Sequence, residues 1–258
     1  MRRISENWTM PEHMDLVEDV IGCIRPDDEE LLGWYRNYAE RQKKRLAFDV
    51  DYVRRFADPT AKLLEFGSTP PILTVALTRL GMSVTGLDLK PERFRSAMNA
   101  QELRIERVDF ETERLPLEDG RYDVVIFNEV FEHLRINPIF TLREARRVLR
   151  PGGTLMLSTP NLTSWKGWYF FAVKGRLAPD IYGQYDKLGK IGHMGHVRVY
   201  SVGEVATFLE RIGFRVTVVI HRGEFQSAIR WRKRLGDTAL RALPRLRTSF
   251  SLIADRVP

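Results

Sequence analysis

Apolar residues recur at helical spacing near the start of the chain. Over residues 11–24 they fall three or four positions apart, which predicts an amphipathic helix. A second, longer helix is predicted over residues 29–56, because Asp28 is a typical cap before it and Pro59 disfavours helix just after it. We therefore expect residues 1–60 to form an N-terminal helical cover.

From residue 62 onward, short apolar runs alternate with segments of helical periodicity. This alternation predicts an α/β fold with a mostly parallel sheet and right-handed crossovers, built from residues 61–258. Strands are expected near residues 62–66, 84–87, 105–108, 123–127, 154–158, 215–220 and 249–254, and helices near 72–80, 92–98, 140–148 and 202–212.

The most informative segment is Leu63 to Asp88, which has the pattern of a β-α-β unit. Its first apolar run ends at an acid-x-Gly turn, Glu65 and Gly67, and its second run ends at Asp88, 21 residues beyond that glycine. A carboxylate at the end of the second strand accepts hydrogen bonds from a ribose diol, and the turn lets a helix N-terminus face a ligand. The unit predicts a site for an adenosine-containing cofactor.

The motifs that follow are RVDFETERLPLEDGRYDVVIFNEVFEHL and LREARRVLRPGGTLMLSTPN, and in this order they resemble the class I S-adenosylmethionine-dependent methyltransferases. The resemblance covers roughly residues 63–219. It implies a Rossmann-like, doubly wound, seven-stranded sheet whose last strand is antiparallel, and S-adenosylmethionine as the cofactor. The cofactor-binding positions that it implies are Glu65, Gly67, Ser68, Thr69, Asp88, Leu89, Asp109, Phe110 and Asn128.

The turn after the first strand departs from the family pattern. Thr69 and Pro71 stand where the family has its second and third glycines. In a dinucleotide site the second glycine lets the backbone touch a pyrophosphate, so Thr69 argues against NAD or FAD, whereas S-adenosylmethionine has no phosphate. Pro71 suits the first residue of a helix, where a missing N–H costs nothing.

Candidate catalytic residues follow the fourth predicted strand. His133 is the first candidate for a general base, because the unperturbed pKa of imidazole lies near neutrality. A framing role without proton transfer is the alternative. Glu129 could act as the base or fix the imidazole, and Glu132 is predicted to be a surface or capping residue.

A second group of histidines stands in the segment GHMGHVRVY. His193 and His196 have the spacing of a metal pair, but glycines flank them and no cysteine is near, so we predict no metal site there. His196, with Arg198 and Tyr200, matches a Gly-His-x-Arg-x-Tyr segment of the resembled family. That match makes His196 an alternative base or a substrate contact.

An aromatic insertion spans residues 160–197. A loop of this length is usually functional or disordered, and its aromatic content does not fit disorder. We interpret it as a lid over the acceptor, with a small helical subdomain that packs its own core as the alternative. Its rings are Trp165, Trp168, Tyr169, Phe170, Phe171, Tyr182 and Tyr185.

Composition adds a local concentration of charge. The net charge is +7 over 258 residues, and residues 221–247 contain eight Arg or Lys against two acids, interleaved with apolar residues. This pattern is typical of a basic amphipathic helix. It predicts peripheral contact with an anionic membrane. Nucleic acid is the weaker partner, since strand four ends in FNEV and lacks the signature of base N-methyltransferases.

The remaining composition narrows the class of protein. No apolar run approaches the roughly 18 residues that cross a bilayer, and the first residues lack a signal peptide's apolar stretch, so we expect a cytoplasmic protein. The single cysteine, Cys23, permits no internal disulfide and is expected to be a small buried hydrophobe.

The sequence therefore predicts methyl transfer from S-adenosylmethionine to a hydroxyl of a glycan, glycolipid or lipid-linked small molecule. Two alternatives from other classes stay open at this point. One is a nicotinamide-dependent oxidoreductase, which Thr69 disfavours, and the other is a catalytically silent, membrane-associated Rossmann-like module.

Overall fold

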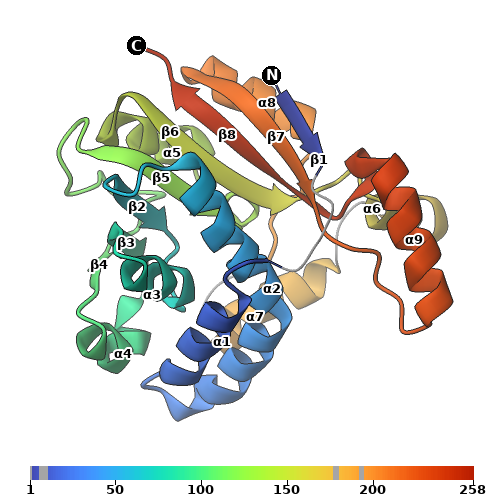
Figure 1. The fold of residues 1–258 in the computed structure, drawn as a ribbon, viewed down its shortest axis with the longest axis horizontal. Helices are drawn as coiled ribbons and strands as arrows, with labels where there is room; N and C mark the ends of the chain where they lie inside the picture. Colours follow the sequence, from blue (N-terminus) through green and yellow to red (C-terminus); the bar gives the residue numbers. More distant parts are fainter. Residues whose placement is uncertain (1, 6–10, 177–179, 192–194) are drawn as a thin grey trace. The chain divides into compact units, whose positions relative to one another are not determined.

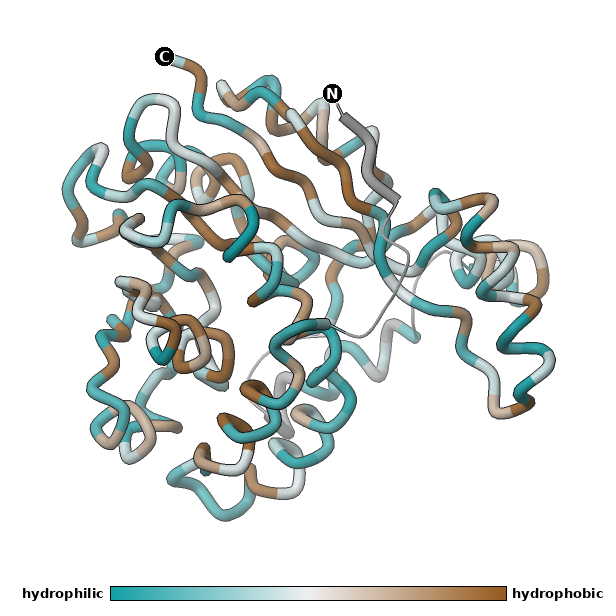
Figure 2. The backbone as a smooth tube through the Cα atoms, in the orientation of Figure 1, coloured by the Kyte–Doolittle hydropathy of each residue, from teal (hydrophilic) through white to brown (hydrophobic). Residues whose placement is uncertain are grey.

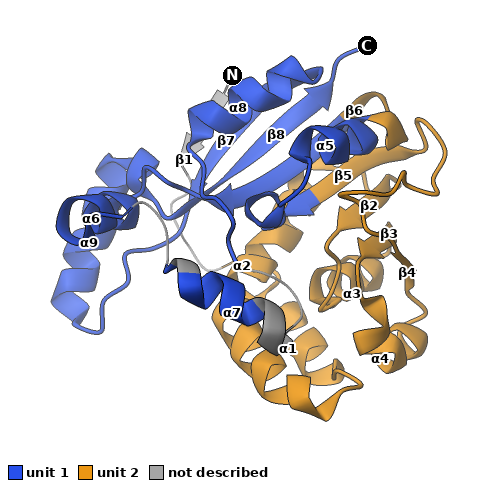
Figure 3. Ribbon diagram, turned by 180° about the vertical axis from the view of Figure 1, so that it is seen from behind, with its two compact units in different colours: residues 1–8, 127–146, 154–258 blue, residues 9–126, 147–153 orange. Residues whose placement is uncertain are grey.

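The computed structural model describes residues 2–5, 11–176, 180–191 and 195–258. The chain divides into two compact units (Figure 3). Unit 1 comprises residues 1–8, 127–146 and 154–258, and unit 2 comprises residues 9–126 and 147–153.

The described strands hydrogen-bond in the order β1-β7-β8-β6-β5-β2-β3-β4 (Figure 1). Their bounds are β1 (Arg2–Ser5), β2 (Lys62–Phe66), β3 (Ser83–Asp88), β4 (Arg104–Arg107), β5 (Tyr122–Asn128), β6 (Leu149–Pro160), β7 (Phe214–Arg222) and β8 (Ser249–Arg256). The α-helices are α1 (Met14–Cys23), α2 (Leu32–Phe56), α3 (Ile72–Arg79), α4 (Arg95–Ala100), α5 (Pro138–Val148), α6 (Trp165–Lys174), α7 (Ile181–Ile191), α8 (Val202–Arg211) and α9 (Arg230–Ala242).

Unit 2 combines the parallel strands β2, β3 and β4 and most of β5 with the N-terminal helices. β2 pairs in parallel with β3, and β3 with β4, so that their carboxyl ends share one edge. Helices α1 and α2 pack against each other and against α3 (Figure 1). Of the apolar side chains of α1 predicted from its period, Met14, Val17 and Val20 are buried and Ile21 is half-buried. Cys23 at the end of α1 is exposed, which contradicts the expectation of a buried residue.

Unit 1 is built on the antiparallel pair β7 and β8. β8 also runs antiparallel to β6, while β1 pairs in parallel with β7. Helix α8 packs on β7 and begins at a capping box, in which Ser201 and Glu204 satisfy each other's backbone N–H. The apolar residues of β7 and β8 stand out in Figure 2, as expected for strands at the centre of a core.

The hydrophobic pattern predicted the main α/β elements and a mostly parallel sheet, and the family resemblance implied an antiparallel last strand; the structure confirms both. Two features differ. An eighth strand, β1, joins the sheet through Arg2 to Ser5, a segment too short and too polar to stand out. The aromatic insertion contains two helices, α6 and α7.

Within the described residues, no helix is both long enough and apolar enough to cross a membrane.

Candidate functional site

The turn after β2 places a buried carboxylate at the strand end in unit 2. Glu65 is 7% exposed, and its Oε2 accepts a hydrogen bond of 2.6 Å from the hydroxyl of Thr74 on α3. Gly67 has a positive φ of 68°, which favours glycine, and its N–H donates to the carbonyl of Leu87. The predicted acid-x-Gly turn therefore reverses the direction of the chain between β2 and α3. Pro71 is the N-cap of α3, one residue before the helix rather than in it.

Asp88 ends β3 and is held by main-chain donors. The N–H of Thr69 donates to one carboxylate oxygen at 3.1 Å, and the N–H of Lys90 donates to the other at 2.9 Å. Burial raises the pKa of Asp88, while these two N–H groups, a hydrogen bond from the Thr69 side chain and the charge of Arg93 oppose the rise. These contacts fix the carboxylate in place, and since a carboxylate offers about four lone-pair sites it can still accept a hydrogen bond from a ligand.

The β3 backbone also approaches the turn closely. A Cβ added at Gly86 would lie 2.4 Å from the hydroxyl oxygen of Ser68, so this position needs glycine. The close approach brings Ser68 and Thr69 next to Asp88, as the family pattern implies.

Burial raises the pKa of Glu65 to about 7, and the nearby carboxylates Asp49 and Asp88 contribute to the rise. The hydrogen bond from Thr74 and the charge of Arg45 oppose it. Arg45 and Asp49 belong to α2, where they form an ion pair of 2.8 Å. Sequence reasoning missed both residues, since it interpreted α2 only as a cover.

Three further predicted cofactor residues lie in unit 2. Leu89 follows Asp88 and is 38% exposed. Asp109 accepts from the N–H of Glu111 at 3.1 Å, a local turn that positions the next residue. The ring of Phe110 packs edge-on against Phe66 of β2, with 5.3 Å between centroids. The described contacts therefore connect the segment after β4 to the end of β2.

The end of β5 lies in unit 1 and carries a strained residue. Asn128 ends the strand, and Glu129 follows it with a φ of 55°, a left-handed conformation that is uncommon for glutamate. Its N–H donates to the carbonyl of Ser158 at 2.8 Å, and the hydroxyl of Ser158 donates to its carboxylate at 3.1 Å. Contacts to β6 thus hold both the backbone and the side chain of Glu129.

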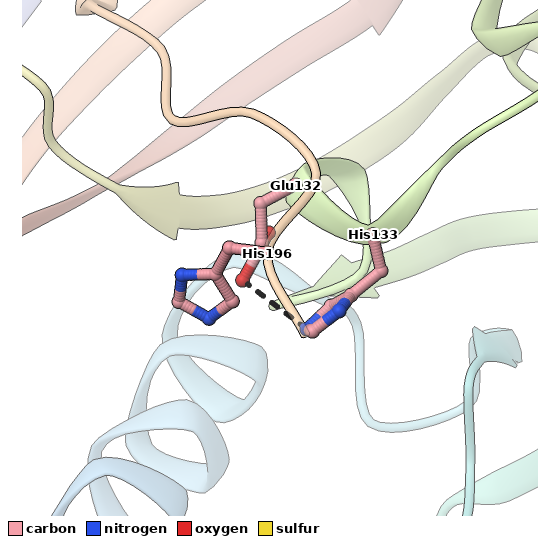
Figure 4. A group of neighbouring side chains, drawn as sticks. All are labelled: Glu132, His133 and His196. Atoms are coloured by element: carbon pink, nitrogen blue, oxygen red, sulfur yellow. Dashed lines mark ion pairs between the residues drawn. The ribbon is translucent and has the colours of Figure 1, made fainter. Parts of the chain in front are cut away.

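Figure 4 shows the side chains of Glu132, His133 and His196 gathered in one place. The two imidazole rings lie edge to face with 5.0 Å between centroids, and Nε2 of His133 is 3.9 Å from Oε1 of Glu132. Nδ1 of His133 lies 3.0 Å from the carbonyl oxygen of Gly195. A carbonyl only accepts, so Nδ1 carries a proton in this contact.

Glu132 corrects a prediction. It is 1% exposed rather than a surface residue, and its carboxylate accepts from the hydroxyl of Thr159 at 2.9 Å. Its carbonyl accepts from the N–H of Val197 at 2.8 Å, which fixes the segment that carries His196. The short 3-10 turn after β5 (Phe131–His133) points Glu132 inward, a direction that residue type alone did not reveal.

His196 is largely enclosed, and burial lowers its pKa while the negative charge of Glu129 opposes the shift. The N–H of His196 donates to Oε1 of Gln184 on α7 at 2.9 Å. This contact connects helix α7 to His196 of the histidine cluster. His193 lies outside the described residues.

The cluster has two chemical uses. An imidazole whose Nδ1 carries the proton can, when the ring is neutral, accept a proton from a hydroxyl at Nε2. The ligand atoms of Glu132, His133 and His196 also lie within 4.8 Å of one another, so the same three side chains could hold a divalent cation.

The aromatic insertion starts from a rigid anchor. The side-chain amide of Asn161 donates to the carbonyls of Arg245 and Arg247, at 2.9 and 2.8 Å. Beyond it, α6 buries none of its residues, and Tyr182 and Tyr185 of α7 are exposed. These rings do not form the core of a small helical subdomain, which removes that alternative for the described part of the insertion.

Comparison with known proteins identifies the class. Residues 38–219 match a family described as a methyltransferase domain, which is more than half of the chain. The chain belongs to the class I S-adenosylmethionine-dependent methyltransferases. The predicted family, fold class and cofactor are confirmed. This assignment excludes the alternative of a nicotinamide-dependent oxidoreductase.

Curated relatives of this methyltransferase carry the name ubiquinone biosynthesis O-methyltransferase. One from Xanthomonas campestris pv. campestris is 36% identical over 119 residues, which is 44% of this chain and 49% of the relative. Another from Nitrosococcus oceani is 36% identical over 131 residues, or 49% and 54% of the two chains. The matched segment thus spans about half the length of the curated relatives.

Solved structures share the fold of the methyltransferase at low sequence identity. One from Archaeoglobus fulgidus, titled a SAM-dependent methyltransferase, has a TM-score of 0.58 at 15% identity and covers 86% of this chain and 100% of its own. Another, a Haloferax volcanii methyltransferase in complex with the activator Trm112, has a TM-score of 0.60 at 17% identity, with 89% and 97% covered.

The residues of unit 2 fit S-adenosylmethionine. Asp88 offers a fixed carboxylate of the kind that receives a ribose diol. The buried carboxyl of Glu65, with a pKa near neutrality, would be ionised by a cationic ligand, and the methyl donor carries a sulfonium and an ammonium group.

Proposed function

We propose that this methyltransferase transfers the methyl group of S-adenosylmethionine to a hydroxyl oxygen of an amphiphilic acceptor, of the glycan, glycolipid or lipid-linked class. The observation that supports oxygen most directly is the tautomer of His133. Its Nδ1 donates to the carbonyl of Gly195, which leaves Nε2 to take a proton. The names of the curated relatives also support an oxygen acceptor.

The donor is held by residues of unit 2 in this proposal. Asp88 accepts both ribose hydroxyls, Glu65 faces the cationic end of the donor, and Arg45 provides the counter-charge for its carboxylate. Leu89 and Phe110 border the adenine. When bound, the cofactor supplies an electrophilic methyl carbon on sulfur.

Methyl transfer is an in-line displacement in which an oxygen–carbon bond forms as the carbon–sulfur bond breaks. The protein aligns the reactants and removes the hydroxyl proton. His133 receives this proton at Nε2 in our proposal. Glu129 and His196 position the acceptor hydroxyl, and His196 is the alternative base.

The insertion over residues 160–197 is proposed as the acceptor lid. Helix α7 supports this role, because its residue Gln184 contacts Gly195 and His196, the two residues that lie beside the imidazole of His133. Its backbone carbonyl accepts from the N–H of Gly195 at 3.1 Å, and its Oε1 accepts from the N–H of His196. An acceptor that orders α7 would therefore also order the carbonyl that orients His133.

A cation at the histidine cluster is the second candidate, and the spacing of the three side chains favours it. Zinc titration separates the two uses. If Nε2 of His133 takes the proton, zinc bound to that lone pair inhibits methyl transfer. Activation by zinc, with loss of activity in a chelator, would instead make the cluster a catalytic metal centre.

The class of acceptor is tested by transfer of labelled methyl groups into cell fractions separated as glycan, lipid, protein and RNA. We expect the label in the lipid or glycan fraction, and much less of it with the Asp88→Ala variant when S-adenosylmethionine is limiting. Label in the protein or RNA fraction would overturn the proposed acceptor class while leaving methyl transfer itself intact.

A further inference from the structure

Helices α6 and α9 of unit 1 are attached to each other by one ring. The ring of Phe225 packs on Trp165 of α6, with 4.4 Å between centroids, and it covers Gly236 of α9 so closely that an added Cβ would lie 2.1 Å from it. The N–H of Phe225 also donates to Asp237 of α9 at 2.8 Å. The two helices overlap in the views of Figures 1 and 3, and the contacts of Phe225 join them.

This attachment uses only one side of each helix. Among its thirteen residues, α9 buries only Leu240, and α6 buries none. Helices of this length are marginal in water without an apolar face that packs on something. The described packing of α6 and α9 therefore leaves their apolar faces available to another partner.

The outer face of α9 is an apolar stripe between arginines. Trp231 and Leu235 are 61% and 62% exposed and lie four positions apart, so they share one side of the helix. That side is opposite Leu240 and Gly236. Arg230, Arg234 and Arg241 follow one flank of the stripe, and Arg232 lies on the other.

Helix α6 adds exposed rings of the same kind. Trp168 and Phe171, three positions apart, are 56% and 53% exposed and pack edge to face. Val173 follows at 61% exposed. The helix contains two lysines and no acid.

Fewer basic residues expose an unpaired charge on this surface than the sequence count suggested. Arg222 and Arg247 are buried, where they contact Ser251 and the carbonyl of Gly223. Lys233 is paired with Glu224 and Asp237 at 2.9 Å. In the part of the chain that the structure describes, Arg230, Arg234 and Arg241 form no ion pair, so their charge faces outward.

We propose that α6 and α9 form a docking surface for an anionic lipid membrane. The stripe of Trp231 and Leu235, with Trp168 and Phe171 of α6, enters the boundary between head groups and acyl chains. The flanking arginines contact the lipid phosphates. This is the arrangement of a helix that lies in the plane of a membrane interface, with an apolar face below and cations at its sides.

A second copy of the chain fits this surface less well. A two-fold contact would place the same arginines against each other, and α9 has five basic residues against one acid. Anionic lipid complements that charge. A single-stranded nucleic acid is the remaining occupant, because it too combines phosphates with stacking on rings, and the test below includes it.

Co-sedimentation with vesicles tests the proposal on the full chain. We expect binding to phosphatidylcholine vesicles that contain phosphatidylglycerol, and little binding to pure phosphatidylcholine. Replacing Arg230, Arg234 and Arg241 together by glutamine should weaken binding about a hundredfold at low salt, an effect that added salt removes. The matched control replaces three exposed arginines of α2, Arg36, Arg41 and Arg54, by glutamine, which changes net charge equally.

The depth of insertion gives a second readout. Quenching of tryptophan fluorescence by brominated lipids should be strong in the wild type and should fall in Trp231→Phe. Equal vesicle binding by the α9 and α2 variants would overturn the proposal. So would vesicle binding too weak to measure together with oligonucleotide binding that needs the same three arginines.

The proposed membrane-docking surface does not depend on the proposed acceptor. Vesicle binding needs neither donor nor acceptor, and its failure would leave methyl transfer untouched.

Discussion

The ends of β2 and β3 differ from the end of β5 in how their side chains are held. In unit 2, Asp88 is held by the N–H of Lys90, two residues away in sequence, and by the N–H of Thr69, 19 residues away. In unit 1, His133 is oriented by the carbonyl of Gly195, 62 residues away. The first site is made by local backbone geometry, and the second exists only when distant segments come together.

This difference implies different consequences of mutation. A donor site made by backbone N–H groups survives most side-chain changes and responds mainly to loss of its own carboxylates. The histidine cluster depends on a loop and on α7, so changes outside the cluster should alter the chemistry. Four substitutions test that contrast, from the largest expected effect to the smallest.

Removing the base should have the largest effect. In His133→Ala we expect kcat to fall about a hundredfold or more, because general-base catalysis typically contributes that much, while the affinity for S-adenosylhomocysteine is unchanged. Steady-state kinetics and calorimetry measure the two quantities. His13→Ala, which removes a histidine that binds Asp51 in unit 2, is the matched control and should keep its kcat. A parallel fall of affinity and turnover in His133→Ala would make His133 a framing residue.

Removing the ribose carboxylate should affect only binding. Asp88→Ala should weaken S-adenosylhomocysteine binding by about ten- to fiftyfold, since hydrogen bonds to a charged group contribute about 1.5–3 kcal/mol. Titration calorimetry checks this, with Asp19→Ala on the exposed side of α1 as the control. Unchanged affinity in folded Asp88→Ala protein would remove the residue from the donor site.

The link between α7 and the base predicts an intermediate effect. Gln184→Ala removes the acceptor of the His196 N–H, and we expect kcat to fall about tenfold and the acid limb of the pH profile to shift. Gln184→Glu keeps an acceptor oxygen and should restore most of the activity. If both variants behave alike, the contact is structural only, and the proposed coupling of lid and base is wrong.

The smallest effect concerns stability and pH. The folded-state pKa of Glu65 is raised to about 7, so its contribution to stability is fully present below about pH 4.5 and is lost as the pH rises through 7. Glu65→Gln abolishes this titration and should therefore be more stable than the wild type at pH 8 by about 3 kcal/mol, with a much smaller difference at pH 5. Urea unfolding at the two pH values measures it. Exposed Glu113→Gln should show no such trend, and a trend of the opposite sign in Glu65→Gln would refute the assignment.

The positions of the proposed donor-binding residues could be predicted from the sequence because they follow from strand ends and turn types. Glu65, Gly67 and Asp88 lie where the β-α-β pattern put them, and Phe110 contacts the end of β2. Arg45 could not be found in this way. It lies in the middle of α2, and its ion pair with Asp49 is local to that helix, but its proximity to Glu65 follows only from how α2 packs in the fold.

The cluster after β5 shows the limit of the same reasoning. His133 and His196 were both candidates, but no local pattern reports that their rings are 5.0 Å apart. Glu132 was placed on the surface because glutamate is usually exposed, whereas the short turn after β5 buries it against Thr159. Likewise, the charge count over residues 221–247 could not separate buried Arg222 from the exposed arginines of α9.

The central claim is that the chain methylates oxygen. Its most direct test is to incubate the purified protein with S-adenosylmethionine labelled with carbon-13 at the methyl group and a lipid extract, and to identify the new linkage by NMR. The account predicts a methyl ether that is formed by the wild type, is strongly reduced in His133→Ala and is unaffected in the His13→Ala control. A labelled methyl group on nitrogen or carbon, or a methyl ether formed equally fast by His133→Ala, would contradict it.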